Sequence, residues 1–335
     1  MDIDTPPLQA PPVDAVLLVG FGGPEGPQDV LPFLENVTRG RGVPPERLAE
    51  VGRHYLDHFG GVSPINAQTR ALRDALQGAL PELPVYWGNR NWHPLLADTL
   101  AELTRDGRRH ALAVVTSAFP SYSGCRQYRE DLARARRPGE PLVTKVRHYH
   151  AEEGFLAPLR RYVDQASDGL EQPRLVFTAH SVPTVMAATS GPSGGAYEAA
   201  LRAASASVAG DRPWDLVWQS RSGPPQVPWL EPDVNDHLRS LAQEGIRDVV
   251  LVPIGFTSDH VEVLYDLDVQ ARATAEDLGL RMTRASTVGT DPQFVKMLAD
   301  LVRERIAAPV ELSSHGGIAT HDRCPLHCCP PPPPR

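Results

Sequence analysis

A histidine at the end of one apolar run is the first residue in this sequence that could do chemistry. The stretch RLVFTAHSVP carries His180 directly after a pattern typical of a buried strand. Because α/β proteins bind ligands beyond the carboxyl ends of parallel strands, His180 lies at a candidate ligand face. A neutral imidazole there can accept a proton or bind a divalent metal. The structural alternative is a histidine whose hydrogen bonds are satisfied by local backbone.

Acidic residues crowd a second strand end, in PIGFTSDHVEVLYDLDVQA. A helix is expected there, with Ser258 or Asp259 as its N-cap. Glu262, Asp266 and Gln270 recur at every fourth position, which places them on one side of that helix. Crowded carboxylates need a cation or a proton to relieve their repulsion, so the pattern indicates oxygen ligands for a divalent cation. A solvated polar helix face is the alternative.

Glycines cluster after the first apolar run, in GFGGPEG. Their spacing departs from G-x-G-x-x-G and Pro24 interrupts it, which predicts a tight turn facing a flat ligand rather than a dinucleotide site. Arg39 and Arg41 follow in TRGRG and suit substrate carboxylates, with a solvent-facing loop as the alternative. Ser63, in HFGGVSPINAQT, is a good helix N-cap in its own right.

Short apolar runs and amphipathic stretches alternate along the chain. The strands and helices that they predict must position the candidate site residues. The runs predicted as strands are residues 15–20, 85–89, 111–119, 144–150, 174–181, 215–220, 248–256 and 280–287. Their hydrophobicity is continuous, as in strands buried on both faces of a parallel sheet. The strand–helix alternation predicts an α/β protein. Two groups of four strands predict two similar lobes, with the break near residues 151–170.

Composition narrows the functions open to the chain. It has 335 residues, 41% of them hydrophobic and 22% charged, which is long enough for two domains and ordinary for a soluble protein. The net charge of −8 argues against a nucleic-acid partner. The start, MDIDTPPLQAPP, has neither the basic nor the apolar part of a secretory signal, and no apolar run approaches the ~20 residues of a membrane span. We therefore expect a soluble cytoplasmic protein with no transmembrane segment.

Cysteine is rare and unevenly placed. Three of the four cysteines lie in the tail HDRCPLHCCPPPPPR, at Cys324, Cys328 and Cys329. Because Cys125 is the only other one, disulfides within the body of the protein are excluded by count. On the tail alone, a weak zinc site that adds His321 and His327 to the thiols is the simplest interpretation.

Several of these strings, taken together and in order, resemble ferrochelatases. The strings are GFGGPEGPQDVLPFLENVTRGRGVP, FGGVSPIN, YWGNRNWHP, TSAFPSYSGCRQYRED, FTAHSVP, WQSRSGPPQVPWLEP and PIGFTSDHVEVLYDLD. The likeness extends from about residue 15 to residue 305 and is closest to the actinobacterial form. It implies the chelatase fold, two Rossmann-like lobes that each hold a four-stranded parallel sheet flanked by helices, with a porphyrin cleft between them. The predicted divisions are a flexible N-terminus (1–12), an N-terminal lobe (13–160), a C-terminal lobe (161–310) and a Cys/Pro-rich tail (311–335).

The resemblance implies that the protein inserts Fe²⁺ into a porphyrin. His180 and Glu262 would be catalytic, facing each other across the porphyrin and contacting the incoming iron. His180 would accept the pyrrole protons and Glu262 would guide iron, although the reverse assignment stays open. Asp266 would continue an acidic path outward, and Gln270 stands where many relatives carry a further acid.

The resemblance also implies a substrate. Porphyrin contacts carry over to Arg39, Ser63 and Tyr128, and to Phe21, where many bacterial relatives have a tyrosine that can ligate product iron. Actinobacterial members are expected to use coproporphyrin III, forming coproheme in haem b biosynthesis for a downstream coproheme-using enzyme. The alternatives are a protoporphyrin IX ferrochelatase, a cobalt or nickel tetrapyrrole chelatase, and a non-catalytic haem-binding protein.

The resemblance gives the cysteines a second interpretation. Some ferrochelatases bind a [2Fe–2S] cluster with one internal cysteine and three C-terminal ones. The four cysteines here divide in that way, into Cys125 and the three of the tail, and four thiolates match the ligand number of such a cluster. Because Cys328 and Cys329 are adjacent, both can ligate only if the chain turns locally.

Overall fold

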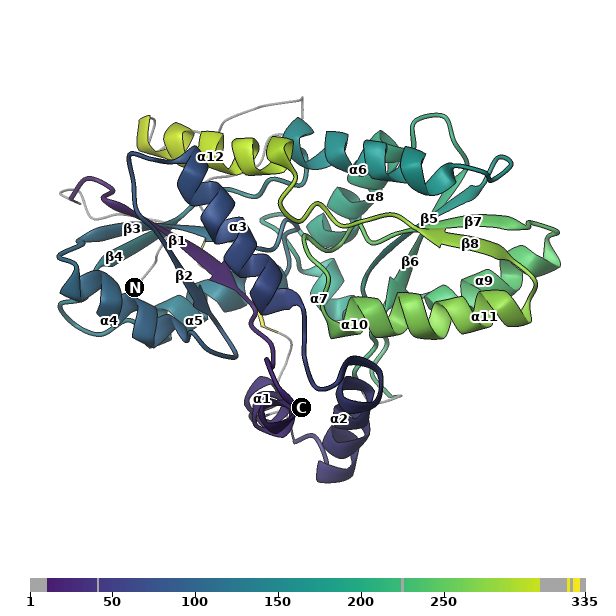
Figure 1. The fold of residues 1–335 in the computed structure, drawn as a ribbon, viewed down its shortest axis with the longest axis horizontal. Helices are drawn as coiled ribbons and strands as arrows, with labels where there is room; N and C mark the ends of the chain where they lie inside the picture. Colours follow the sequence, from purple (N-terminus) through teal and green to yellow (C-terminus); the bar gives the residue numbers. More distant parts are fainter. Residues whose placement is uncertain (1–10, 41, 224–225, 308–323, 326–327, 332–335) are drawn as a thin grey trace.

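The protein is built on two parallel β-sheets that lie side by side (Figure 1). The computed structural model describes residues 11–40, 42–223, 226–307, 324–325 and 328–331. One sheet contains β1 (Ala15–Gly20), β2 (Val85–Asn89), β3 (His110–Val115) and β4 (Leu142–Lys145). The other contains β5 (Arg174–His180), β6 (Trp214–Gln219), β7 (Asp248–Val252) and β8 (Arg281–Arg284). The α/β prediction is confirmed.

The two sheets repeat one topology. Their strand orders are β2-β1-β3-β4 and β6-β5-β7-β8, and every pairing is parallel. The chain direction across each sheet therefore reverses beside its first strand, between β1 and β3 and between β5 and β7. Such points open a crevice for ligands at the strand ends. The loops that follow β3 and β7 meet, because Thr257, after β7, donates a hydrogen bond of 3.0 Å to the carbonyl of Thr116, after β3.

Continuous apolar runs became strands because both faces of each sheet are covered. Every residue of β1 and of β7 is buried, as the predicted two-sided burial requires. Several strands are shorter than predicted: the run 248–256 pairs only to Val252, and the run 144–150 only to Lys145. The residues after these points leave the sheet and form the loops at its ligand edge.

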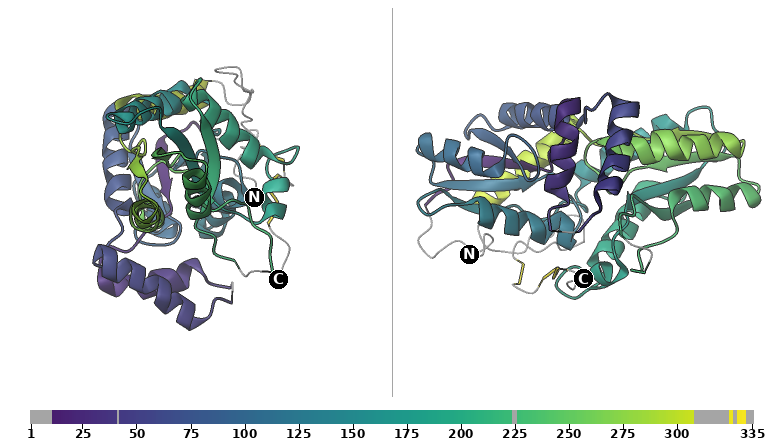
Figure 2. Two further views of the ribbon diagram at one scale, coloured as in Figure 1. Left: turned by 90° about the vertical axis from the view of Figure 1, so that its right-hand side faces the viewer. Right: turned by 90° about the horizontal axis from the view of Figure 1, so that it is seen from below.

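Helices cover both sheets, and a pair of them stands apart (Figures 1 and 2). The helices of the first half are η1 (Pro27–Asp29), α1 (Val30–Val37), α2 (Pro45–Phe59), α3 (Ile65–Ala79), α4 (Leu96–Arg105), η2 (Tyr122–Arg126) and α5 (Gln127–Ala135). Those of the second half are α6 (Glu153–Ser167), α7 (Thr184–Ala188), α8 (Ala196–Ala209), α9 (Val234–Gln243), α10 (Val261–Val263), η3 (Leu264–Ala271), α11 (Arg272–Asp277) and α12 (Pro292–Ala307). α1 and α2 lie outside the two sheets, on the side where β1 ends.

One apolar core runs through both halves. It joins Val16 and Leu112 of the first sheet to Phe177 and Val252 of the second, with α3, α6, α8 and α12 packed on it. The outer face of each sheet has a core of its own. The predicted boundary between residues 160 and 161 falls within α6, which packs against α12. The division into lobes at that residue stays a prediction.

The expectations for the two ends of the chain and for a membrane span concern different sets of residues. Most of the predicted flexible N-terminus and most of the tail lie outside them, as do Arg41, His321 and His327. None of the helices in the described part of the chain combines the length and apolarity that crossing a membrane requires.

Candidate active site

His180 is the last residue of β5 and presents one ring nitrogen for chemistry. Its Nδ1 donates a hydrogen bond of 2.6 Å to the carbonyl of Ser181. Because a carbonyl only accepts, this contact assigns the proton of the neutral ring to Nδ1 and leaves the lone pair on Nε2. The side chain is 35% exposed, so Nε2 can meet a substrate. The backbone provides a hydrogen-bond partner for Nδ1 only. A histidine held entirely by local backbone, the structural alternative, would need a second such partner at Nε2.

Glu262 brings a carboxylate to that free nitrogen. It is the second residue of α10, and its Oε2 lies 3.8 Å from Nε2 of His180. The two groups come from different elements, one from the end of β5 and the other from the helix that follows β7. A lone-pair nitrogen beside a carboxylate can accept protons from a substrate or bind a divalent cation.

The crowd of acids predicted in this region separates into two groups. Asp259 and Asp268 both pair with Arg284, the last residue of β8, at 3.1 Å and 2.8 Å. Both carboxylates are thus held by one guanidinium within the fold. Asp259 does not cap the helix, which begins at Val261. Glu262 is not part of this ion-pair network. Asp259, before the helix, and Asp268, on it, are thus structural acids, while the carboxylate of Glu262 is left beside His180.

Asp266 is a half-buried acid one helical turn beyond Glu262. Its carboxylate accepts hydrogen bonds from the Ser220 hydroxyl and, at 3.4 Å, from the side-chain amide of Gln219. Burial, with help from the charge of Glu262, raises the pKa of Asp266 to about 6. The group can therefore gain or lose a proton near neutral pH, which an ordinary aspartate cannot do.

The helix that carries these acids is wound unusually. η3, from Leu264 to Ala271, is π-helical, a rare form that is frequent at functional sites. Gln270 lies on it and is exposed. Tyr265 stacks on His54 of α2, with ring centroids 4.0 Å apart, which ties the outlying helix pair to the site. Period-based reasoning missed the winding because apolar spacing does not distinguish π from α over two turns.

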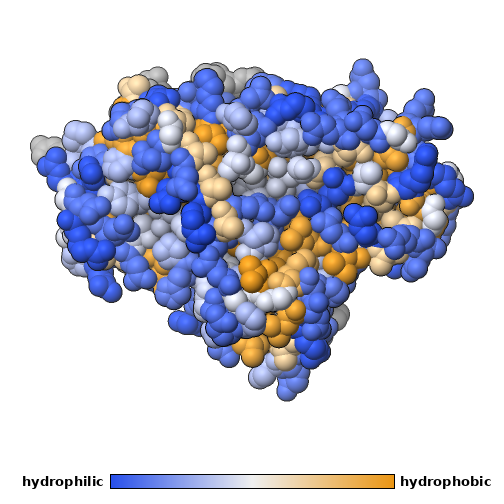
Figure 3. All heavy atoms as spheres, in the orientation of Figure 1, coloured by the Kyte–Doolittle hydropathy of each residue, from blue (hydrophilic) through white to orange (hydrophobic). Residues whose placement is uncertain are grey.

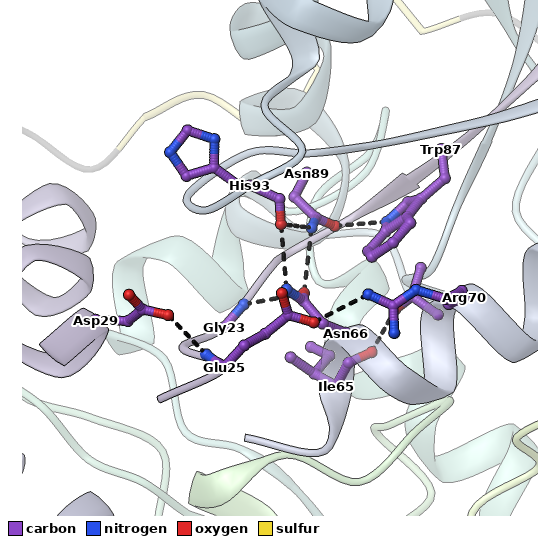
Figure 4. Close-up of polar contacts among 10 residues, drawn as sticks. Gly23, Glu25, Asp29, Ile65, Asn66, Arg70, Trp87, Asn89 and His93 are labelled. Carbon is purple, nitrogen blue, oxygen red and sulfur yellow. Dashed lines mark hydrogen bonds and ion pairs between the residues drawn. The ribbon is translucent and has the colours of Figure 1, made fainter. Parts of the chain in front are cut away.

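The glycine-rich turn after β1 is held by a network of amides (Figure 4). Asn66 of α3 accepts hydrogen bonds from the backbone N–H of Gly23 at 3.3 Å and from Asn89 at 3.2 Å. Gly22 has φ +85°, and a Cβ there would lie 2.9 Å from the backbone nitrogen of Trp92. A Cβ at Gly20 would lie 2.4 Å from Asn89. The glycines are therefore required by the protein's own packing.

Comparison with known proteins decides the family. A model of the ferrochelatase family matches residues 13–306. This chain belongs to the ferrochelatase family. It is 50% identical to the coproporphyrin III ferrochelatase of Streptomyces coelicolor, with 98% of this chain and 96% of that protein covered. It is 51% identical to the protein of the same name from Streptomyces griseus, covering 95% and 94%, and 48% identical to the ferrochelatase of Rhodopirellula baltica, covering 96% and 94%.

Two solved structures share the chelatase fold. SirB from Bacillus subtilis with Fe³⁺ aligns with a TM-score of 0.56 at 12% identity, over 88% of this chain and 96% of that one. CbiX, the terminal enzyme for siroheme biosynthesis in denitrifying bacteria, aligns with a TM-score of 0.51 at 16% identity, over 87% and 98%. At these identities the likeness concerns the fold alone, and it confirms the predicted chelatase architecture.

The contact between His180 and Glu262 bears on one expectation drawn from the ferrochelatase resemblance. The sequence-based hypothesis placed His180 and Glu262 on opposite sides of a porphyrin. Atoms that contact the two faces of a flat ring are about 7 Å apart, because each contact needs about 3.5 Å. The observed 3.8 Å leaves no room for the ring. The placement of the two side chains relative to a porphyrin therefore stays a prediction.

The residues predicted to contact porphyrin have different surroundings in this ferrochelatase. Arg39 is exposed after α1, and Ser63 is buried before α3. Phe21 is half-buried and meets the ring of Phe33 edge-on. Tyr128 is 4% exposed and lies in the core of the first sheet, beneath the guanidinium of Arg90, which is 4.4 Å from the ring centroid. Their role in binding stays a prediction.

Apolar side chains gather near the site. Figure 3 shows hydrophobic atoms extending from α10 to the region between α1 and α2. Leu31 of α1, Leu56 of α2 and Val62 are large apolar residues that remain 42% to 49% exposed. A patch of this kind marks a binding surface more often than chance exposure does. A flat, largely apolar ring would cover it.

The four cysteines come together in one buried cluster, although sequence separates them by about 200 residues. Each is at most 6% exposed and none forms a disulfide. Cys125 lies in η2, the segment after β3, and a hydrogen bond with Cys324 and burial raise its pKa to about 12. Fixed thiols that exclude water are typical of a metal site or of an inert core.

A local turn lets the adjacent cysteines share this cluster. The N–H of Cys328 donates to the carbonyl of Pro325 at 2.9 Å, and Cys329 adopts φ +48°, a left-handed conformation that costs a non-glycine residue about 1 kcal/mol. The two sulfurs consequently lie 3.8 Å apart. Among the residues that the structure describes, no three histidine, cysteine or acidic side chains are arranged around a single ion.

Proposed function

We propose that this ferrochelatase inserts Fe²⁺ into coproporphyrin III to form coproheme in haem b biosynthesis. The observation that carries the proposal is the convergence of His180 Nε2 and Glu262 Oε2 at 3.8 Å beside an apolar surface. Relatives about 50% identical over nearly the whole chain are named coproporphyrin III ferrochelatases, which supports the choice of porphyrin.

The reaction exchanges two protons for one metal ion. A free-base porphyrin releases two pyrrole N–H protons as Fe²⁺ enters, and the porphyrin ring keeps both electron pairs. His180 accepts the two pyrrole protons one after the other on Nε2, since Nδ1 already carries a proton, and it passes the first on before it accepts the second. Glu262 binds the incoming cation with Oε2 and removes part of its hydration shell. Asp266, with a pKa of about 6, can take the proton onward from the pair.

The substrate carboxylates and the ring meet different parts of the site. The macrocycle lies against the apolar surface of Leu31, Leu56 and Val62. Arg39 is exposed after α1 and pairs with propionates, for which a guanidinium is well suited. Phe21 cannot ligate iron, so the product depends on His180 or another group for any axial ligand. In this proposal, coproheme is then released in the cytoplasm to a downstream enzyme that uses it.

We also propose a [2Fe–2S] cluster bound by Cys125, Cys324, Cys328 and Cys329. Four buried thiols in one group match the number of ligands that such a cluster needs. When bound, the cluster would supply one-electron chemistry and would hold the tail against η2.

One anaerobic experiment tests the reaction. Purified protein is mixed with Fe²⁺ and either coproporphyrin III or protoporphyrin IX, and the Soret and visible bands are followed. We expect faster metallation of coproporphyrin III. Faster metallation of protoporphyrin IX would contradict the choice of substrate only, whereas metallation of neither would reject the ferrochelatase activity and leave a haem-binding role. Parallel assays with Co²⁺ and Ni²⁺ test the alternative metals.

A further inference from the structure

We propose that the C-terminal cysteine segment positions His180 through a buried relay of hydrogen bonds that passes through Gly191 and Tyr197. This inference rests on the proposed role of His180, but it does not depend on which metal group the cysteines bind. Tyr197 and Cys329 are positioning residues in this relay.

The first contact joins the tail to the loop between α7 and α8. The backbone N–H of Gly191 donates to Sγ of Cys329 at 3.1 Å, and both residues are buried. Gly191 has φ +77°, and a Cβ there would lie 2.4 Å from the Cβ of Ala196. Only glycine can follow this path, and the path turns the N–H toward the sulfur.

The second contact ties that loop to the start of α8. Ser190, directly before Gly191, is fully buried. Its hydroxyl accepts from the N–H of Tyr197 at 2.8 Å and donates to the carbonyl of Ala187 at 2.6 Å. Because both hydrogen bonds hold the Ser190 hydroxyl in place, a displacement of Gly191 also displaces Tyr197.

The third contact reaches the catalytic strand. The hydroxyl of Tyr197 donates to the carbonyl of His180 at 2.8 Å, while the ring packs near Trp218. The imidazole of His180 is held in turn by the carbonyl of Ser181. Two consecutive carbonyls thus fix the end of β5 and the ring on it. A loss of this support changes the distance between Nε2 and Glu262.

The relay begins at a seam between the two halves of the chain. Cys125 belongs to η2 of the first half, and Arg126 donates to the carbonyl of Cys328 at 3.4 Å. Gly191 belongs to the second half. The tail therefore connects the loop after β3 to the loop that precedes α8. Small displacements of a catalytic group, of about 1 Å, can lower rates by as much as 100-fold.

The first test compares two buried tyrosines. Tyr197→Phe removes the hydroxyl that supports His180. Tyr149→Phe is the matched control, because the Tyr149 hydroxyl also donates to a backbone carbonyl at 2.8 Å, that of Val115, and is equally buried. We expect kcat for metallation to fall about tenfold in Tyr197→Phe, with KM for Fe²⁺ and for porphyrin changed less than twofold, and to stay near wild type in Tyr149→Phe. Equal falls in both variants would overturn the relay.

The second test separates the hydrogen bond at Cys329 from metal ligation. Cys329→Ala and Cys329→Ser both remove a thiol, but serine retains an acceptor for the N–H of Gly191. We expect kcat to fall about tenfold with alanine and only two- to threefold with serine. Cys329→Ala combined with Tyr197→Phe should be no slower than either alone. Equal losses with alanine and serine, or additive losses in the pair, would overturn the proposal.

Hydrogen exchange gives a readout that does not depend on activity. In Cys329→Ala, amides of residues 181–197 should exchange about tenfold faster than in Cys329→Ser, whereas those of α9 should exchange at equal rates in the two variants. Unchanged exchange in 181–197 would contradict the relay. If the wild-type protein metallates no porphyrin, the proposed reaction fails, and the exchange experiment still decides whether the tail supports the end of β5.

Discussion

The Nε2 atom of His180 lies 3.8 Å from Oε2 of Glu262, and the proton of the imidazole is held on the opposite nitrogen by the carbonyl of Ser181. The first group ends a strand and the second begins a helix, so the pair exists only where the two crevice-side loops of one sheet meet. This relationship turns two common side chains into a site for exchanging protons and a metal.

Replacement of either member should remove most of the activity. His180→Ala deletes the proton acceptor, and Glu262→Gln deletes the charge that binds the cation while it preserves shape. We expect kcat to fall by about 10² to 10⁴ in each case, the usual contribution of such groups. Stopped-flow metallation of coproporphyrin III measures the loss. Glu276→Gln, an exposed acid on α11 of the same helical stretch, serves as the control and should keep wild-type rates.

Metallation should weaken as pH falls through the pKa of Asp266, about 6. Protonation removes the charge that draws protons and cations away from Glu262. We expect Asp266→Asn to reduce the rate about tenfold at pH 7.5 and to flatten the acid limb of the pH–rate profile. A variant profile that falls with the wild-type midpoint would show that another group titrates there.

Asp266 should also set a pH dependence of stability. Its folded pKa, about 6, is above the ordinary value of 3.8, so the folded state binds the proton more tightly than the unfolded state. The stabilisation from protonation is present below pH 4 and is lost as pH rises through 6. Asp266→Asn should therefore raise the free energy of unfolding by roughly 2 kcal/mol at pH 8 and little at pH 4. Urea titrations at the two pH values measure the difference.

The cysteines should bind iron and acid-labile sulfide. Anaerobically purified protein should contain about two of each per chain and show visible charge-transfer bands. Cys125→Ser should lose the colour, whereas Ser123→Ala, two residues away in η2, should keep it. Stoichiometric zinc without labile sulfide, or no metal at all, would reject the cluster.

Arg90 should contribute to stability through two kinds of contact. Its guanidinium is 4% exposed, pairs with Asp131 at 2.6 Å and lies above the ring of Tyr128. In Arg90→Met, Asp131 stays partly buried and loses the guanidinium that it pairs with. We expect the free energy of unfolding to fall by about 3 kcal/mol. Adding Asp131→Asn should recover part of this loss. Urea denaturation of the single and double variants measures both values; equal stability of the two variants would argue against the ion pair.

The apolar runs of the chain predicted its strands and the position of His180. Runs such as AVLLVG and DVVLV are apolar at every position, which suits only strands covered on both faces, and this property predicted the parallel sheets. His180 was located because a strand pattern ends at it. The glycines of residues 20–23 were correctly associated with close backbone approach, although they contact Asn89 and Trp92 of the protein itself.

Contacts between distant segments had to come from the tertiary structure. The sequence placed acids near Glu262, but Arg284 of β8 decides that Asp259 and Asp268 are structural. The winding of η3 depends on packing that apolar spacing does not encode.

The sequence by itself determined the fold class, the family and the residue types of the site, because local hydrophobicity and long family-like strings are properties of contiguous segments. Only the tertiary structure decided that His180 and Glu262 lie 3.8 Å apart, and that Cys125 joins three cysteines about 200 residues away. Distances of this kind depend on the order of the strands and on the paths of the loops, and both of these depend on packing throughout the chain.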